Sequence, residues 1–277
     1  MKERWRWLVA LALGAMPLSL GCPDGHGAVT QKVEVSDTQK YAIWSLTCLA
    51  ENSQATFAYN YAENIGDGRG ITFGIIGFTS GTYDGTMLLL RIRELEPANP
   101  LVGYLPAFQA IDASPHGSNG CSDGTAGLAG FMEAFEAHGN DAAVKQAQIE
   151  KLTALYWEPT AVQAKRIGAR SAITLGELYD SCVNHGEDGN SVDLGLRQLV
   201  EKANAKAGGT PLSGVDEMAW LKAFLQVRRA YLEKGWPDAV DRVDMYSRLL
   251  ESGNMGLAVP FAASCYGESF TIGGTKP

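Results

Sequence analysis

From Gly124 almost to the C-terminus, apolar residues recur with the three- and four-residue spacing of amphipathic helices. An earlier stretch, from about Ser36 to Ser53, has the same pattern and begins with capping residues. Breaks at Gly and Pro divide the later part into segments at about 127–138, 141–157, 160–185, 192–206, 215–234 and 237–252. Most of this chain must therefore fold by packing helices against one another.

One early segment has a different pattern. The run I-T-F-G-I-I-G-F at 71–78 is rich in β-branched and aromatic residues, and we expect it to form a buried strand. A helix is expected at 87–95, followed by a loop-rich crossover at 96–123 that contains several Pro and Gly. The tail ends in a Gly-rich stretch. The predicted fold class is α+β, mostly helical, with one small sheet early in the chain.

The first 21 residues have the pattern of a signal peptide. Lys2, Arg4 and Arg6 precede an apolar run from Trp7 to Leu20. That run is too short and too interrupted to span a membrane as a helix. We therefore expect 1–21 to be a signal peptide and the protein to be exported.

The signal ends in S-L-G-C, which is similar to a bacterial lipoprotein signal. In that case Cys22 would be lipidated and would become the first mature residue, whereas ordinary secretion with cleavage nearby is the alternative. We expect a polar leader at 22–31 and the folded part of the protein at 32–277. The protein would be secreted, or periplasmic or on the outer surface as a lipoprotein.

Charge and cysteine content narrow the classes of partner and cofactor. The formal net charge is −8, which argues against nucleic acid because phosphates are bound by Lys and Arg. Besides Cys22 there are Cys48, Cys121, Cys182 and Cys265, which allow three disulfide pairings in an oxidising compartment. No cysteines stand at metal-ligand spacing and the four histidines are scattered. We expect neither a metal nor a cofactor.

Glu51 lies at the end of an apolar helix face. Tyr41, Trp44, Cys48 and Glu51 follow one another at steps of three, four and three, which places them on one side of the helix. Loss of hydration and the negative end of the helix dipole would both favour a protonated Glu51. A general acid needs that state. The alternative is a Glu at the rim of the core that points to water.

Asp67 has the opposite surroundings. In I-G-D-G-R-G at 65–70, glycines expose backbone N–H groups and Arg69 places a cation near the carboxylate. These groups favour an ionised Asp67. Two carboxyl groups in such contrasting settings are typical of glycosidases that use one acid and one base. Taken alone, Asp-Gly is also a common turn dipeptide.

A longer stretch of sequence around Glu51 and Asp67 resembles one particular enzyme family. The runs E-N-S (51–53), Y-x-Y-x-E-x-I-G-D-G-R-G-I-T-F-G-I-I-G-F (59–78) and S-G-T (80–82) resemble the active-site segment of the family 46 chitosanases. Weaker similarity continues in W-E-P (157–159), L-Y-D-x-x-V-x-H-G (178–186), F-L-x-x-R (224–228) and R-V-D (242–244). The resemblance implies a two-lobed, lysozyme-like α+β fold with a cleft between the lobes.

The resemblance also implies a reaction, the inverting endo-hydrolysis of β-1,4 bonds in chitosan. Glu51 stands at the position of the general acid, and Asp67 at that of the general base that activates water. Thr72 matches a threonine that helps to hold this water. Inversion requires room for the water, so the two carboxyl groups should stand roughly 6.5–9.5 Å or more apart.

Other positions carry implied roles in binding and support. Tyr61 and Arg69 match residues of the cleft, and Asp84 resembles the acidic residue that binds a substrate amine, although T-Y-D-G-T has one extra residue. Three further residues match a buried charged network in the second lobe, and we interpret them as structural: Asp180, Arg228 and Arg242.

Chitosan is a polycation, which suits an acidic protein. We expect a monomer that meets a membrane only through a lipid anchor. The alternatives are a related hydrolase of peptidoglycan or β-glucan and a non-catalytic glycan-binding lipoprotein. Two loops, 110–126 and 185–193, depart from the family pattern. The second lacks the full spacing of a calcium loop.

Overall fold

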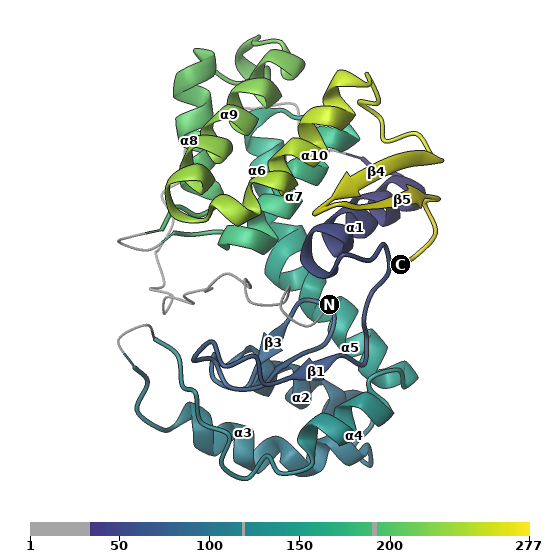
Figure 1. The fold of residues 1–277 in the computed structure, drawn as a ribbon, viewed down its shortest axis with the longest axis vertical. Helices are drawn as coiled ribbons and strands as arrows, with labels where there is room; N and C mark the ends of the chain where they lie inside the picture. Colours follow the sequence, from purple (N-terminus) through teal and green to yellow (C-terminus); the bar gives the residue numbers. More distant parts are fainter. Residues whose placement is uncertain (1–33, 118–119, 190–192) are drawn as a thin grey trace, which may run out of the picture.

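The computed structural model describes residues 34–117, 120–189 and 193–277, and these residues form two lobes (Figure 1). The smaller lobe, at the bottom of Figure 1, holds a three-stranded sheet and the helices that follow it. The larger lobe consists of the first helix, the later helices and a C-terminal hairpin. Each lobe has its own hydrophobic core. The signal peptide, the leader up to residue 31 and Cys22 lie outside the described residues.

Helix α1 (Asp37–Asn52) begins where the sequence predicts it. The Ser36 hydroxyl accepts a hydrogen bond from the Gln39 backbone N–H, and the Gln39 side chain accepts one from the Ser36 N–H. This capping box fixes the start of the helix. Residues 42–50 are all buried, because α7 (Ala172–His185) and the C-terminal hairpin pack on α1.

The expected single strand at 71–78 is wrong. The segment forms two short strands, β2 (Thr72–Phe73) and β3 (Phe78–Thr79), and β2 also pairs with β1 (Ala62–Glu63) in an antiparallel sheet. Gly74 and Gly77 adopt positive φ angles of 74° and 67°, which reverse the chain between the strands. The apolar run therefore forms a tight hairpin.

Phe73 of β2 is the centre of the smaller core. Its ring packs edge-on against Phe108, Phe131 and Phe135, with ring centroids 4.9–5.7 Å apart. Phe108 lies on α3 (Leu105–Asp112), and the other two rings lie on α4 (Phe131–His138). The same lobe also contains α2 (Asp84–Leu95) and α5 (Ala142–Leu152). The expected loop at 96–123 thus contains a helix, preceded by a 3-10 turn at Pro100–Tyr104. Pro100 and Pro106 occupy first-turn positions of these two elements, where Pro is tolerated.

One helical segment connects the two lobes. Helix α5 continues through a π-helical turn (Thr153–Trp157) into α6 (Glu158–Ile167). Trp157 packs against Trp44 of α1 and Tyr179 of α7, with centroids 6.2 and 5.4 Å apart. The expected helix at 160–185 is wrong as one element, because Gly168 ends α6 with a φ of 75°.

The larger lobe is completed by α8 (Leu196–Ala207), α9 (Glu217–Gly235) and α10 (Val240–Glu251), with 3-10 turns at Pro211–Ser213 and Pro237–Ala239. The Gly-rich tail, for which the sequence predicted no strand, contains the antiparallel hairpin of β4 (Phe261–Cys265) and β5 (Glu268–Ile272). Its turn consists of Tyr266 and Gly267, both at positive φ. The hairpin packs on α1 and α10 (Figure 1).

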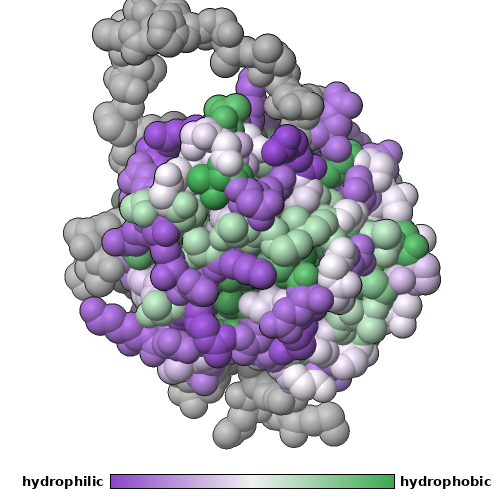
Figure 2. All heavy atoms as spheres, turned by 90° about the horizontal axis from the view of Figure 1, so that it is seen from above, coloured by the Kyte–Doolittle hydropathy of each residue, from purple (hydrophilic) through white to green (hydrophobic). Residues whose placement is uncertain are grey.

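None of the three disulfide pairings forms, because Cys48, Cys182 and Cys265 are buried free thiols. In the described ranges, no helix is long and apolar enough to cross a membrane. Seen from above the larger lobe, hydrophilic residues cover much of the surface and hydrophobic residues lie between them in small groups (Figure 2). Such a face is normal for a protein surface in water.

Candidate active site

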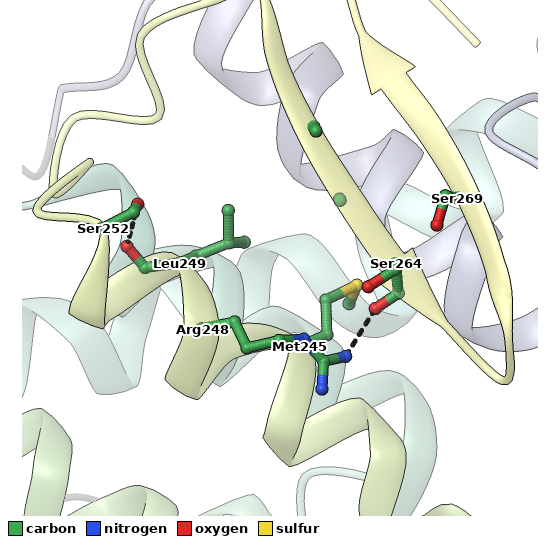
Figure 3. Close-up of a pocket in the computed structure, with 8 residues that line it drawn as sticks. Met245, Arg248, Leu249, Ser252, Ser264 and Ser269 are labelled. Atoms are coloured by element: carbon green, nitrogen blue, oxygen red, sulfur yellow. Dashed lines mark hydrogen bonds between the residues drawn. The ribbon is translucent and has the colours of Figure 1, made fainter.

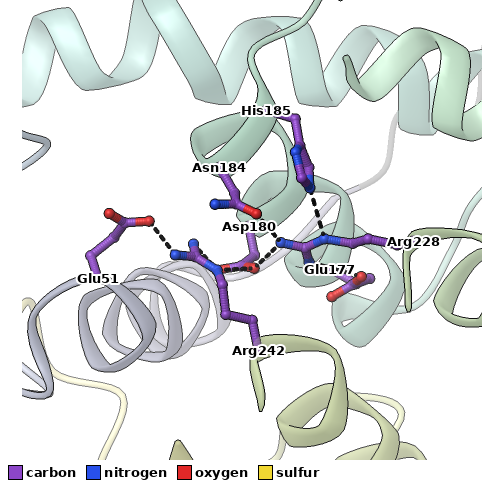
Figure 4. Close-up of polar contacts among 7 residues, drawn as sticks. All are labelled: Glu51, Glu177, Asp180, Asn184, His185, Arg228 and Arg242. Carbon is purple, nitrogen blue, oxygen red and sulfur yellow. Dashed lines mark hydrogen bonds and ion pairs between the residues drawn. The ribbon is translucent and has the colours of Figure 1, made fainter. Parts of the chain in front are cut away.

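Glu51 lies in the last turn of α1, with its side chain only 11% exposed. Its Oε1 accepts a hydrogen bond of 2.5 Å from Nη1 of Arg242 on α10 (Figure 4). The sequence placed Arg242 only in a supporting network, whereas the structure puts it directly on Glu51. The guanidinium group stabilises a negative charge on Glu51. The sequence argument for a protonated Glu51 did not include this contact.

Arg242 also contacts the expected network. Its Nε and Nη2 donate to Asp180 at 3.1 and 2.8 Å, and Arg228 Nη2 donates to the same carboxylate at 2.8 Å. All three side chains are buried. Burial alone would raise the pKa of Asp180, but the guanidinium groups of Arg242 and Arg228 lower it below its usual range. The structure therefore brings together the three residues that the sequence grouped.

Sequence reasoning missed the next member of this chain of charges. Glu177 lies on α7 three residues before Asp180, and its Oε1 accepts a hydrogen bond of 3.0 Å from Arg228 Nη1. The Glu177 side chain is fully buried. The available signal was the spacing of three between two acidic residues on a helix that carries a buried motif.

Asp67 lies in the loop between β1 and β2, in the smaller lobe. Arg69 donates to its Oδ2 from Nε at 2.7 Å and to its Oδ1 from the backbone N–H at 3.1 Å. The Asp67 side chain is 21% exposed and that of Arg69 only 7%. Gly70 has a φ of 78°, and a Cβ there would lie 2.1 Å from Ser80 Oγ. The glycine-rich loop thus holds a partly exposed carboxylate against a buried counter-ion.

Thr72 of β2 is fully buried, and its hydroxyl has no hydrogen-bond partner among the residues that the structure describes. Buried hydroxyl groups nearly always have a partner, from protein or from water. This hydroxyl follows the Asp67 loop by a few residues in the same sheet. A bound water molecule would complete its hydrogen bonding.

Two of the three expected binding residues, Tyr61 and Asp84, form local hydrogen bonds. The Tyr61 hydroxyl donates to Glu63 Oε2 at 3.1 Å. Oδ1 of Asp84 accepts from the Thr79 N–H, the Thr82 hydroxyl and the Gly85 N–H at 2.7–3.1 Å. Burial raises the pKa of Asp84 to about 6, against the effect of these hydrogen bonds. One carboxyl oxygen of Asp84 thus already accepts three hydrogen bonds near the start of α2.

Tyr156, in the π-helical turn that joins the lobes, was not singled out from the sequence. Burial raises the pKa of its hydroxyl, and the charges of Asp84 and Glu51 add to the effect while Arg69 opposes it. Tyr156 is therefore within electrostatic reach of the candidate groups of both lobes. Glu51 belongs to the larger lobe and Asp67 to the smaller one, so the fold places one carboxyl group in each lobe.

A separate pocket of about 180 Å³ lies between α10 and the C-terminal hairpin (Figure 3). Arg248 donates there to the Ser264 carbonyl oxygen at 2.7 Å. No residue predicted from the sequence as part of the site lines this pocket. Within the described residues, no group of three or more His, Cys, Asp or Glu side chains is arranged to hold a metal ion.

Comparison with known proteins decides the family. The model of glycosyl hydrolase family 46 matches residues 45–261. The chain belongs to glycosyl hydrolase family 46. This family 46 member is 34% identical over 282 residues to a chitosanase of Streptomyces sp. (strain N174) and 36% identical over 287 residues to one of Nocardioides sp. (strain N106). Each alignment covers 96% of this chain and 96% of the relative.

Solved structures of similar proteins agree with the fold of this family 46 chain. A mutant chitosanase from Bacillus subtilis MY002, complexed with 6 GlcN, has a TM-score of 0.75 and 30% sequence identity, covering 86% of this chain and 100% of that one. A Gynuella sunshinyii chitosanase with chitotetraose has a TM-score of 0.75 and 34% identity, covering 86% and 98%. The predicted family, the lysozyme-like α+β fold and the class of glycoside hydrolase are confirmed.

Proposed function

We propose that the chain is an endo-acting chitosanase that cleaves β-1,4 bonds with inversion, with Glu51 as general acid and Asp67 as general base. One observation carries the assignment of roles. The two carboxyl groups belong to opposite lobes, and each is held by an arginine of its own lobe, Arg242 or Arg69. A glycan between the lobes would meet an acid on one side and a base on the other.

The smaller lobe, which carries Asp67, has groups that can direct a water molecule. Arg69 forms an ion pair with Asp67, and the buried Thr72 hydroxyl lacks a partner among the described residues. A water held by both would lose its proton to Asp67 as its oxygen bonds to the anomeric carbon. Attack from the face opposite the leaving group inverts the configuration.

The acid side supplies the proton for the leaving oxygen. As Glu51 donates this proton, a negative charge develops on a carboxyl group that already faces Arg242. A donor placed in advance toward developing charge stabilises the transition state. The contact with Arg242 thus assists proton transfer, provided that Glu51 carries its proton when the substrate binds.

The substrate we propose is chitosan, because the similar proteins are chitosanases and two of the similar structures hold glucosamine oligomers or chitotetraose. A net charge of −8 favours the approach of a polycation. Tyr61, Arg69 and Asp84 are the proposed contacts with the sugars, with Asp84 facing an amine. We also propose that the protein acts as a monomer outside the cytoplasm, secreted or anchored through Cys22.

The test is to incubate the purified protein with chitosans of graded acetylation and to analyse the products by mass. We expect a series of short oligomers to appear early, as endo cleavage requires. Release of reducing ends would exclude a binding protein without activity. Loss of turbidity of cell walls, without cleavage of chitosan, would instead indicate a hydrolase of peptidoglycan.

A further inference from the structure

Tyr83 is an exposed aromatic residue with a strained backbone, directly before Asp84. It has a φ of 68° and a ψ of −26° at the N-cap of α2, and its side chain makes no capping hydrogen bond. This left-handed conformation suits Gly and is disfavoured for a residue with a Cβ atom. Of the large hydrophobic side chains exposed in the described ranges, only that of Tyr83 is aromatic. Neither burial nor capping explains a tyrosine here, and such strain is concentrated at sites that bind ligands.

His116 covers one face of the Tyr83 ring. The two rings are stacked, with centroids 4.9 Å apart and planes 9° apart. The imidazole is itself fixed, because its Nδ1 donates a hydrogen bond of 2.9 Å to the Ser114 carbonyl oxygen. No second ring among the described residues stacks on Tyr83. Since 44% of Tyr83 is exposed, the other face of its ring is open to a ligand.

The loop that carries His116 is fixed beside the candidate active site. Further along this loop, the Ser122 N–H donates to the Gly81 carbonyl oxygen at 3.0 Å, and the Gly81 N–H donates to that of Arg69 at 3.0 Å. A Cβ atom at Gly81 would lie 1.6 Å from the Ser122 carbonyl oxygen, so the backbones pack without room for a side chain. The loop therefore lies against the segment that connects Arg69 to Tyr83.

Electrostatic contacts also place this loop near the proposed base. Burial raises the pKa of the Cys121 thiol in the same loop, and three charged groups of the site act on it as well: Arg69 lowers it, and Asp67 and Asp84 raise it. Arg69, the partner of Asp67, also acts on the carboxyl group of Asp84. Tyr83 thus borders the residues that we assign to substrate binding.

A glucosamine unit has the chemistry to bind the open face of Tyr83. The faces of a β-linked glucosamine ring carry C–H groups, which lose contact with water when they pack on an aromatic ring. Its ammonium group is attracted by the negative face of a tyrosine ring. Oδ1 of Asp84 already accepts three hydrogen bonds, and its Oδ2 accepts none from a described residue. Asp84 and Tyr83 can therefore each contact a cationic sugar.

We propose that Tyr83 is a further specificity-determining residue, whose open ring face stacks on a glucosamine unit next to the one on Asp84. His116 is a positioning residue that fixes the angle of the tyrosine ring. Gly at position 83 would have a relaxed backbone but would offer no ring to the sugar. This inference rests on the proposed function, because it assumes that Asp84 faces a substrate amine.

The test is the affinity for a soluble glucosamine hexamer, measured by isothermal titration calorimetry in Glu51→Gln, which should bind without cleaving. Adding Tyr83→Asn removes the ring, and Asn is tolerated in the left-handed conformation. The Kd should rise about two- to fivefold, which corresponds to one exposed contact between a cation and an aromatic ring. Tyr83→Phe keeps the ring face and should leave the Kd unchanged. An unchanged Kd in Tyr83→Asn would overturn the inference.

Val162→Asn is the matched control, because Val162 is an exposed apolar residue of α6 in the larger lobe. It should leave the Kd unchanged. An increase in Kd as large as that of Tyr83→Asn would mean that loss of any exposed apolar side chain weakens binding, and the role of the stack would be rejected.

NMR of carbon-13-labelled tyrosine rings distinguishes contact with the sugar from an effect through the fold. The Tyr83 signals, identified as those missing in Tyr83→Asn, should shift when the hexamer is added to Glu51→Gln. Signals that do not move, while the Kd rises in Tyr83→Asn, would contradict stacking. If the hexamer shifts these signals but the unchanged protein cleaves no chitosan, the proposed function fails and the stacking stands.

Discussion

Arg242 donates a hydrogen bond of 2.5 Å to Glu51, a residue 191 positions earlier in the chain. The contact joins the end of α1 to α10 and ties the proposed acid to a buried set of charges. It gives Glu51 a partner that stabilises its charge after proton donation.

The first prediction concerns the two carboxyl groups. Glu51→Gln and Asp67→Asn should each lower kcat on chitosan by about 10³-fold, because each removes a proton donor or acceptor from the reaction. The fold should persist, since both changes conserve shape, and circular dichroism would check this. Glu94→Gln, on an exposed residue paired with Arg91, is the control and should keep full activity. Near-normal turnover in either variant would remove that residue from the mechanism.

A second prediction concerns stereochemistry. If Asp67 activates water on the face opposite the leaving group, cleavage of a β-bond should first release the α-anomer. Proton NMR of the anomeric signals during the first minutes of digestion distinguishes the two outcomes. Initial formation of the β-anomer would show retention, and the base role of Asp67 would have to be replaced by that of a nucleophile.

Thr72 and Thr79 allow a third prediction, because they lie opposite each other in the sheet. Thr72→Val removes a hydroxyl that has no partner among the described residues, so stability should be unchanged or slightly higher while kcat falls by about tenfold. Thr79→Val removes a hydroxyl that pairs with Thr82, which should cost about 1 kcal/mol of stability. Urea unfolding and initial rates give both quantities.

A loss of stability in Thr72→Val as large as that in Thr79→Val would mean that the Thr72 hydroxyl supports the fold. Unchanged kcat would exclude a role in holding water. The pair of variants therefore separates a structural hydroxyl from one that serves the reaction.

A fourth prediction concerns stability against pH. In the unfolded chain Glu177 ionises near pH 4.3, whereas burial raises its pKa to about 7 in the folded protein. Between these values the folded state binds more protons than the unfolded state, so stability falls as pH rises. The loss of stability amounts to about 4 kcal/mol at most and does not grow further above the folded pKa.

Glu177→Gln should remove this dependence of stability on pH. The difference in unfolding free energy between Glu177→Gln and the unchanged protein should therefore shift in favour of the variant from pH 4.5 to pH 8. Chemical denaturation at several pH values measures it. A difference that stays constant with pH would mean that Glu177 does not titrate in this window. Asp84, whose pKa burial also raises, is present in both proteins and cancels.

Much of the local structure was predictable because the signals are short in range. Ser36 and Gln39 form a capping box within one turn, and α1 starts where they predict. The prediction of a single strand at 71–78 was wrong for a local reason as well, because Gly74 and Gly77 within this apolar run adopt positive φ angles. The C-terminal hairpin was missed because a Tyr-Gly turn in a Gly-rich tail is a weak signal.

In the candidate site, too, some contacts were predictable from local sequence and others depend on tertiary packing. Asp67 and Arg69 are two positions apart, so the glycine-rich loop by itself determines that a carboxylate and its counter-ion meet. The sequence also determined the family, since the motifs around Glu51 and Asp67 are long and ordered. The partner of Glu51 and the ion pair between Arg228 and Glu177 were decided only by tertiary structure. Ion pairs between helices depend on how those helices pack, and no local pattern encodes a contact across 191 positions.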